Sequence, residues 1–196
     1  SLPGEGDLQP GLVQIDDVPG LPRILLIGDS ISISYTLATR NLLTGVANVH
    51  RVPMNGGDTD RGLEHLDEWL ATGGKGKTWD VVHFNWGIHD LKRLKEGRTF
   101  TGPHVNPPER YTEHLRRLVT RLKRTGAKLV FATPTPIPAG AHRCIAGDEI
   151  TFNAAALRVM RENGVAINDL HAWIAPRIAG LQRPENVHFL RTGNAV

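Results

Sequence analysis

Short apolar runs alternate with segments of helical periodicity along most of the chain. The first run, Arg23-Ile-Leu-Leu-Ile-Gly28, is apolar at consecutive positions and ends in glycine, which is typical of a strand buried on both faces of a parallel sheet. Residues 31–43 then carry apolar side chains at roughly helical intervals, and Gly45 follows as a helix stop. The pattern therefore predicts a strand, a sharp turn and a helix.

The same alternation continues towards the C-terminal end of the sequence. Further strands are predicted at residues 46–52, 79–85, 127–132 and 165–168, and further helices at residues 61–70, 109–124, 148–163 and 171–178. Five strands that alternate with helices predict an α/β fold, a three-layer α/β/α sandwich with a central, mainly parallel five-stranded sheet and right-handed crossovers. We expect a single domain over residues 23–196.

Residues 1–22 have a different pattern, with four prolines among several Gly and Asp residues, and this predicts an extended leader that wraps the outside of the domain. These residues lack the basic-then-apolar order of a signal peptide. No apolar run in the sequence approaches the ~20 residues that cross a bilayer. We expect a protein without a membrane span, and the sequence leaves open whether it is cytoplasmic or secreted after removal of a signal.

Composition and charge limit the kinds of binding partner that we expect for the protein. Hydrophobic residues make up 40% of the chain and charged residues 22%, which is ordinary for a soluble globular protein. The formal net charge is only +3, with Lys and Arg interspersed among Asp and Glu, so a nucleic-acid partner is not expected. Cys144 is the single cysteine, which excludes an intrachain disulfide. Nothing in the sequence indicates the oligomeric state.

Polar residues and glycines follow three of the predicted strands. The segments are Gly28-Asp29-Ser30, Asn55-Gly-Gly-Asp-Thr59 and Asn85-Trp-Gly-Ile-His-Asp90. Because the carboxyl ends of parallel strands meet at one edge of a sheet, we expect the three segments to lie close together. A fourth segment, Glu185-Asn-Val-His188, pairs an acid with a base near the end of the sequence.

These residue types fit nucleophilic acyl transfer. Ser30 is predicted at the first turn of a helix, where free N–H groups and the helix dipole favour negative charge. His188 is a candidate base for the serine proton, and Glu185 is a candidate partner for its Nδ1 atom. Each segment taken alone also has a structural interpretation, as a helix cap, an ordinary turn or a surface carboxylate beside a histidine.

Together, in this order, the four segments resemble the sequence blocks of the SGNH (GDSL-like) hydrolase superfamily. The resemblance spans residues 24–188: Gly28-Asp-Ser-Ile31 is similar to the serine block, Gly57 to the glycine block, and Glu185-Asn-Val-His-Phe189 to the Asp-x-x-His block. It implies a flavodoxin-like fold and a serine ester hydrolase that needs neither a metal nor another cofactor. Ser30 would be the nucleophile, His188 the general base and Glu185 the residue that orients His188.

The sequence departs from the family pattern at three places. His89 occupies the position of the oxyanion-binding asparagine; an imidazole N–H is able to donate to an oxyanion beside the N–H groups of Ser30 and Gly57, and Asn85 is the alternative donor. Glu185 stands where the family has aspartate. The family usually continues into a closing helix, and the printed sequence ends at Val196 before such a helix.

The resemblance implies a short-chain carboxylic ester as the substrate, and it favours small acyl groups on carbohydrate, such as O-acetyl groups, over long lipid chains. Trp86, Phe100, His104 and the loop at residues 96–108 are candidates for shaping the pocket, or else simply stabilise a long surface loop. Two alternatives stay open: a non-catalytic carbohydrate-binding relative, and an O-acyltransferase that uses the same residues.

Two further chemistries are less favoured. His83, His89, Asp90 and His188 raise the possibility of a metal site, but the sequence has no recognised zinc spacing. Cys144 as a thiol nucleophile has no comparable sequence context.

Overall fold

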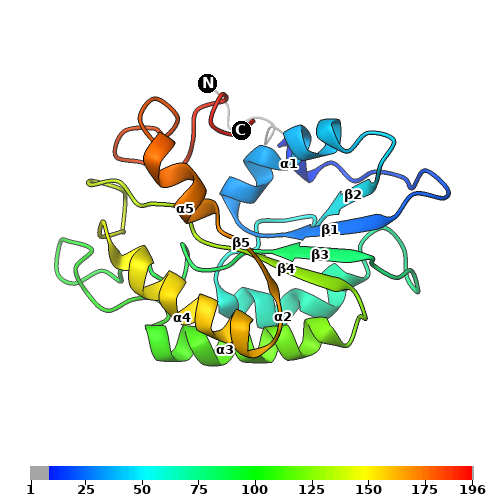
Figure 1. Ribbon diagram of the computed structural model, residues 1–196. Coiled ribbons are helices and arrows are strands. Elements are labelled where there is room, and N and C mark those ends of the chain that lie inside the picture. Colours follow the sequence, from blue (N-terminus) through cyan, green and yellow to red (C-terminus); the bar gives the residue numbers. More distant parts are fainter. Residues whose placement is uncertain (1–8, 196) are drawn as a thin grey trace, which may run out of the picture.

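The computed structural model describes residues 9–195, which fold around a five-stranded sheet of order β2-β1-β3-β4-β5 (Figure 1). Every neighbouring pair of strands is parallel, and Leu25 of β1 lies opposite His50 of β2 and Val82 of β3. The strands are β1 (Arg23–Ile27), β2 (Asn48–Arg51), β3 (Val81–Phe84), β4 (Lys128–Ala132) and β5 (Ala166–Asn168). The predicted five-stranded parallel sheet is thus confirmed.

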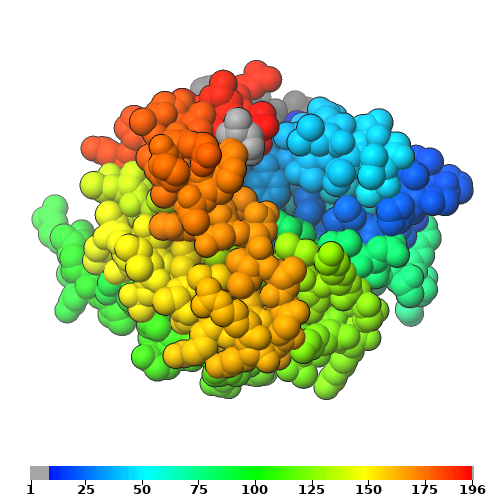
Figure 2. All heavy atoms as spheres, viewed as in Figure 1, coloured from blue at the N-terminus to red at the C-terminus, as the bar shows by residue number. Residues whose placement is uncertain are grey.

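Helices cover both faces of the sheet, as predicted for a three-layer α/β/α sandwich. One face carries α1 (Ser30–Leu42) and α5 (Leu170–Ile174). The other carries α2 (Thr59–Leu70), α3 (Pro108–Lys123) and α4 (Asp148–Glu162). Figure 2 shows the last part of the chain, in orange and red, gathered on the same face as α1. Within residues 9–195 no helix combines the length and the apolar character needed to span a bilayer.

The structure shortens several of the predicted elements, and for two of them the local cause is clear. The helix predicted at residues 171–178 ends at Ile174 and continues as the 3-10 helix η2 (Ala175–Arg177), because Pro176 has no N–H for an α-helical bond. The strand predicted from residue 46 begins only at Asn48. The N–H groups of Val46 and Ala47 both donate to the Leu43 carbonyl, which keeps them in the turn that ends α1.

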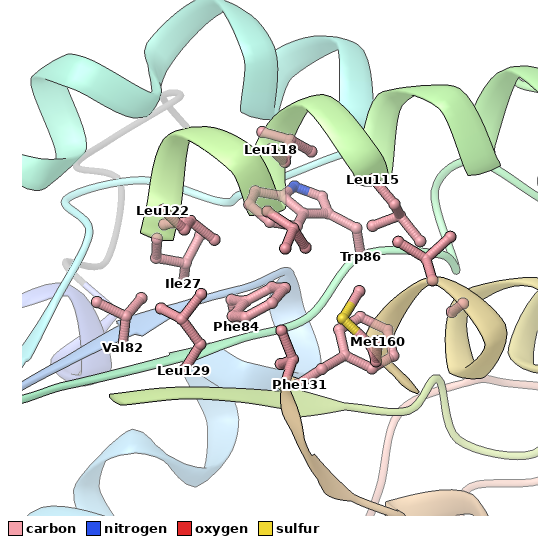
Figure 3. Packing of buried hydrophobic residues seen from close by; sticks show 14 of the residues in the cluster. Ile27, Val82, Phe84, Trp86, Leu115, Leu118, Leu122, Leu129, Phe131 and Met160 are labelled. Carbon is pink, nitrogen blue, oxygen red and sulfur yellow. The ribbon is translucent and has the colours of Figure 1, made fainter. Parts of the chain in front are cut away.

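The main hydrophobic core lies between the sheet and the helices α2, α3 and α4. In Figure 3, apolar side chains of the strands face the apolar stripe of α3 and Met160 of α4. The fully buried side chains at the centre include Phe84, Trp86, Leu118 and Phe131. A smaller buried cluster on the α1 and α5 face consists of Ile31, Ile88, Ile174 and Phe189. The fold therefore has one large and one small apolar layer.

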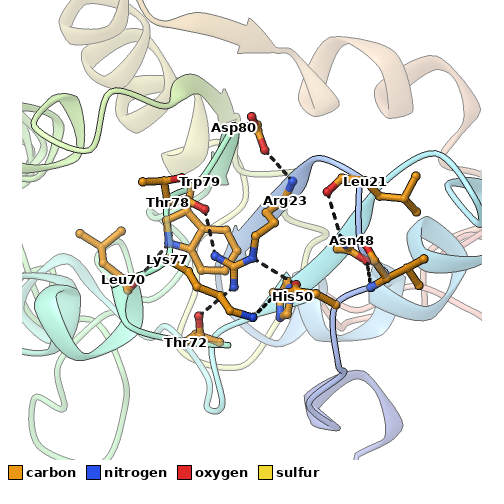
Figure 4. A network of polar contacts seen from close by, with 12 residues as sticks. Leu21, Arg23, Asn48, His50, Leu70, Thr72, Lys77, Thr78, Trp79 and Asp80 are labelled. Carbon is orange, nitrogen blue, oxygen red and sulfur yellow. Dashed lines mark hydrogen bonds and ion pairs between the residues drawn. The ribbon is translucent and has the colours of Figure 1, made fainter. Parts of the chain in front are cut away.

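The N-terminal segment was predicted as an extended leader over residues 1–22, of which residues 1–8 lie outside the described part. Between residues 9 and 22 it contains only the short 3-10 helix η1 (Pro10–Leu12). Asn48 of β2 fixes this segment: its Nδ2 donates to the carbonyls of Val18 (3.0 Å) and Leu21 (3.2 Å) (Figure 4). The segment therefore runs along the β2 edge of the sheet.

A cluster of charges fixes the same segment at Asp17. The Asp17 carboxylate contacts His50 Nε2 at 2.6 Å, Arg23 Nε at 3.1 Å and the Lys77 ammonium. The bond from Lys77, together with those from His50 and Arg23, holds the pKa of Asp17 well below its usual range. Asp17 therefore stays ionised and joins the N-terminal segment to β1 and β2.

Candidate active site

Ser30 lies at the turn between β1 and α1, as the sequence predicts. Asp29 is the N-cap of α1, and its carboxylate accepts a hydrogen bond from the Ile31 N–H at 2.9 Å. Ser30 is the first helical residue, so its own N–H belongs to the turn in which the helix supplies no carbonyl partner. The serine is half-buried at the carboxyl end of the sheet.

The buried side chain of Arg51, at the end of β2, holds this turn in place. Its Nη2 donates to the carbonyls of Gly28 (2.7 Å) and Asp29 (3.1 Å) and to Ser32 Oγ (3.0 Å). Its Nη1 donates to the carbonyls of Val52 (2.9 Å) and Met54 (2.8 Å). Burial lowers the pKa of Arg51 to about 10, so the guanidinium stays protonated at neutral pH.

The backbones of the first two loops also meet directly. The Gly56 N–H donates to the Gly28 carbonyl at 2.8 Å, and a Cβ atom at residue 56 would lie only 2.7 Å from that carbonyl oxygen. Glycine is therefore required at residue 56 for the approach. This contact and the Arg51 guanidinium bring the loops after β1 and β2 together at one edge of the sheet.

His188 contacts Ser30 directly: its Nε2 lies 2.7 Å from Ser30 Oγ. On the other side of the ring, Nδ1 lies 2.7 Å from Asn186 Oδ1, which also accepts the backbone N–H of His188 at 3.0 Å. Because this side-chain atom of Asn186 accepts the backbone N–H, it is the amide oxygen and not the amide nitrogen. An oxygen can only accept, so Nδ1 of His188 carries the ring proton and donates it to Asn186. Nε2 is then the unprotonated nitrogen that accepts from the serine hydroxyl.

The sequence predicts that Glu185 contacts His188 Nδ1, but the structure does not bring the two side chains together. Glu185 has a backbone φ of +52° and an exposed side chain that lies beside Gly140, where an added Cβ atom would be 2.8 Å from Glu185 Cγ. Within residues 9–195 its carboxylate makes no hydrogen bond with the His188 ring. Asn186 takes the expected place because the left-handed backbone at Glu185 turns the carboxylate away from the histidine.

Apolar packing sets the distance between serine and histidine. Ile31, which follows Ser30, and Phe189, which follows His188, belong to the same buried cluster. Arg183 N–H donates to the His188 carbonyl at 3.0 Å, which closes the loop that carries the histidine. The His188 ring is partly buried, and this burial lowers the pKa of His188, so the imidazole is neutral at pH 7.

The three candidate oxyanion donors differ in their availability. The Gly57 N–H donates to Asn55 Oδ1 at 2.9 Å, so that side chain occupies it. The Asn85 amide is buried, and its Nδ2 donates to the Ala132 carbonyl at 2.7 Å. His89 is half-buried after β3, and no such bond to the backbone engages its ring within the described residues.

The Lys92 ammonium lies beside the imidazole of His89. Its Nζ is 3.4 Å from Nδ1 and 3.5 Å from Nε2. Burial and the Lys92 charge both lower the pKa of His89, whereas the Asp29 and Asp58 charges oppose this shift. The ring is therefore neutral, with one N–H to donate, and it lies near the first residues of α1 and α2.

Asp90 connects the loop after β3 to the start of α2. Its Oδ1 accepts from the Thr59 N–H (3.0 Å), the Thr59 hydroxyl (2.5 Å) and Asn106 Nδ2 (2.8 Å), whereas its buried Oδ2 has no partner among the described residues. Thr59 Oγ1 also lies 3.0 Å from His114 Nδ1. Burial raises the pKa of Asp90 to about 7. This aspartate fixes a loop and lies in the protein interior.

The remaining residues that were predicted to shape the pocket make packing and polar contacts elsewhere in the protein. Trp86 is fully buried and donates to the Gly56 carbonyl at 3.3 Å, Phe100 packs edge-on against His142, and His104 contacts Asp148 at 2.9 Å. None of these three lines the cleft that contains Ser30 and His188.

The metal and thiol alternatives have little support. Burial raises the pKa of the Cys144 thiol and lowers that of His83 to about 4. Within residues 9–195 no group of three His, Cys, Asp or Glu residues is arranged to hold a metal ion.

Arg51, Asn186 and Lys92 are three residues of the site that were not predicted from the sequence. A signal for Asn186 was present, because an asparagine two residues before a histidine readily accepts that residue's backbone N–H and so brings its oxygen beside the ring. Arg51 had no comparable signal. Arginine at the end of a strand is usually exposed, and only the meeting of two loops around it creates its acceptors.

The buried Asp90 makes folding stability depend on pH. An unfolded chain releases this proton near pH 3.8, whereas the folded protein holds it up to about pH 7. Between these values the folded state binds the extra proton, so the contribution of Asp90 to the free energy of unfolding decreases as pH rises. Relative to wild type, Asp90→Asn should become progressively more stable from pH 4 to 7, by up to about 1.4 kcal/mol per pH unit.

Urea unfolding at several pH values measures this difference. Asp16→Asn, which changes an exposed carboxylate, is the matched control. A difference between Asp90→Asn and wild type that stays constant from pH 4 to 7 would contradict the raised pKa.

Comparison with known proteins agrees with the predicted family at the level of fold. No protein-family model and no curated protein sequence matches the chain. Among solved structures, the acetyl xylan esterase AlAXEase is 17% identical over 88% of this chain and 94% of its own, with a TM-score of 0.68. Axe2, an acetylxylan esterase from Geobacillus stearothermophilus, is 18% identical over 88% and 89%, with a TM-score of 0.69.

A lipase/acylhydrolase from Enterococcus faecalis is 19% identical over 89% of this chain and 90% of its own, with a TM-score of 0.67. The similarity covers nearly the whole length of each structure. The chain therefore shares its α/β fold with these esterases and with the lipase/acylhydrolase.

Proposed function

We propose that the protein is a serine ester hydrolase that acts on short-chain carboxylic esters. The observation that carries the proposal is the 2.7 Å contact between Ser30 Oγ and His188 Nε2, with the opposite ring nitrogen held by Asn186. This arrangement provides a nucleophile, a base and a residue that fixes the tautomer of the base. The shared fold with esterases and a lipase supports the same reaction class.

The reaction proceeds in two displacements. The Ser30 hydroxyl gives its proton to His188 Nε2 while Oγ attacks the acyl carbon, and the resulting tetrahedral oxyanion collapses with loss of the alcohol, which takes the proton from Nε2. Water then gives a proton to Nε2 and attacks the acyl-serine, and Ser30 leaves with that proton. Every proton moves between Ser30, His188, substrate and water, so these steps require no cofactor.

The oxyanion is stabilised at the start of α1. The Ser30 N–H and the dipole of α1 favour negative charge there. His89 donates one imidazole N–H, and burial together with the neighbouring Lys92 ammonium lowers the pKa of His89 and so favours the neutral ring. The Gly57 N–H joins them when Asn55 releases it.

We extend the proposal to O-acetyl groups on carbohydrate. Two of the three compared structures are acetyl xylan esterases. A panel of acetylated sugars and of p-nitrophenyl esters with C2 to C12 acyl chains tests this choice, and faster turnover of the long-chain esters would contradict it.

Replacing Ser30 tests the proposal as a whole. Ser30→Ala should lower the turnover of p-nitrophenyl acetate by at least about 10³-fold, because the nucleophile is removed. Thr120→Ala, which removes an exposed hydroxyl on α3, is the control. Equal rates for wild type and Ser30→Ala would reject the hydrolase and favour a non-catalytic relative. Transfer of the acyl group to an added sugar, in preference to water, would identify an acyltransferase.

The pH dependence of kcat/KM tests the His188–Asn186 pair. His188 accepts a proton only when neutral, so activity is lost as pH falls through its pKa, which burial places below 6.5. Asn186→Asp places a carboxylate at Nδ1 and should raise the midpoint of this acid limb by about one pH unit. Asn186→Ala should lower kcat/KM at least about tenfold, because the ring tautomer is no longer fixed.

Glu185→Gln is the matched variant for this experiment. If it moves the acid limb while Asn186→Asp does not, Glu185 is the partner of His188 in solution. An acid limb at or above pH 6.5 in the wild type would contradict the lowered pKa.

The oxyanion donor is tested by two alanine variants. His89→Ala should lower turnover by about 10² to 10³-fold, the usual effect of losing one such donor, and His89→Asn should restore part of it. A severe effect of Asn85→Ala at unchanged thermal stability, together with a silent His89→Ala, would assign the role to Asn85 instead.

A further inference from the structure

A cleft of about 330 Å³ opens beside Ser30 and His188. Its other walls come from two parts of the chain: Gln9, Pro10 and Gly11 of the N-terminal segment, and Ile33, Ser34 and Leu37 of α1. The N-terminal segment, predicted only as an outer wrapping, therefore reaches the candidate nucleophile.

The N-terminal segment is seated directly on the backbone of α1. Gly11 is buried, and a Cβ atom at this position would lie 2.3 Å from the Ile33 carbonyl oxygen, so a larger residue would displace the segment. Within the segment, the Leu12 N–H donates to the Gln9 carbonyl at 2.8 Å. Gln14 Nε2 then donates to the Arg51 carbonyl at 3.2 Å. The wall of the cleft is thus attached to the residue that also holds the Ser30 turn.

Further along, the segment is fixed to the edge of the sheet by Asn48 and by the charge cluster at Asp17 (Figure 4). These contacts fall at residues 17–21, close enough in sequence to limit where residues 9–11 lie. The cleft is therefore a built feature of the fold.

The cleft lies on the side where the alcohol part of an ester must be. His188 gives its proton to the leaving oxygen, so that oxygen lies next to Nε2, and His188 lines the cleft. The candidate oxyanion donors His89 and Gly57 do not line it. A space of about 330 Å³ is also far larger than the short acyl group of the proposed substrate.

The side chains that line the cleft indicate that it binds a neutral, amphipathic ligand. Pro10, Ile33 and Leu37 offer apolar carbon surface, and Leu37 is 42% exposed. Gln9 and Ser34 offer an amide and a hydroxyl, and the Ser34 hydroxyl donates to the Ser30 carbonyl at 3.0 Å, which leaves its oxygen free to accept. A pyranose ring combines apolar C–H faces with a rim of hydroxyl groups and so matches both kinds of wall.

We propose that this cleft binds the carbohydrate ring that carries the ester, and that residues 9–11 with Ser34 and Leu37 determine specificity for it. The inference rests on the proposed esterase function and adds the subsite that selects the alcohol. Among the described residues that line the cleft there is no Asp, Glu, Lys or Arg, which favours neutral sugars over anionic alcohols such as phospholipid head groups.

The test compares two esters that differ in the alcohol. For each variant, kcat/KM is measured on an acetylated methyl xylopyranoside and on p-nitrophenyl acetate, and the ratio of the two values is taken. Gly11→Val, which pushes the segment off α1, and Leu37→Glu, which adds a charge to the cleft, should each lower this ratio about tenfold or more. Leu42→Glu is the matched control, since Leu42 is 79% exposed on the same helix and outside the cleft.

Gln9→Ala serves as a second variant in case Gly11→Val does not fold, because Gln9 is exposed. It should also lower the ratio, by removal of one hydrogen-bonding group. Ratios within twofold of wild type in Leu37→Glu and Gln9→Ala would overturn the inference. A second outcome would also overturn the inference: the wild type prefers C8 to C12 acyl chains, and Leu37→Glu abolishes that preference. The cleft would then hold the acyl group and not the alcohol.

The outcome for Ser30→Ala separates the two proposals. If hydrolysis of p-nitrophenyl acetate depends on Ser30 but the ratios do not move, the subsite inference alone fails. If hydrolysis does not depend on Ser30, the proposed function fails and the inference fails with it.

Discussion

The geometry of the candidate site depends on one buried cation. Arg51 lies at the carboxyl end of β2, and among residues 9–195 no carboxylate is in hydrogen-bonding contact with it. Its two terminal nitrogens donate to four backbone carbonyls and one hydroxyl. A loop at the end of a strand exposes carbonyls that neither sheet nor helix satisfies, and a planar guanidinium reaches several of them at once. Loss of this side chain would remove one donor from each carbonyl. The Gly28 and Asp29 carbonyls would keep the N–H groups of Gly56 and Ile33, but the guanidinium that links the turns around Ser30 and Met54 would be gone.

Most of the fold was predictable because it follows from hydrophobic periodicity. Consecutive apolar residues in β1 and the 3.6-residue repeat in α3 both reflect burial in a three-layer sandwich, and the structure has both elements within a few residues of the predicted bounds. The misplaced ends have local causes, such as Pro176 and the turn that closes α1. Hydrophobic periodicity indicates which face of a helix or strand is buried. It does not indicate where the preceding turn includes the first residues predicted for a strand.

The candidate site was predictable only in part. The meeting of Ser30 and His188 follows from their positions relative to the sheet and from apolar neighbours that pack together, so the order of the segments along the chain is informative. The partner of the histidine does not follow in that way. Glu185 and Asn186 are adjacent, and a left-handed φ at Glu185 decides which of the two side chains faces the ring. Glutamate rarely adopts a left-handed φ, so the residue type at position 185 does not predict this backbone angle.

The separation of Ser30 and His188 by 158 residues has a consequence for synthesis of the protein. A growing chain contains the serine from an early stage, whereas the imidazole that contacts it is added near residue 188 and needs Phe189 to dock beside Ile31. Until then the hydroxyl has no base and remains an ordinary alcohol. The contact between the two side chains therefore forms only when the last part of the domain has folded onto α1.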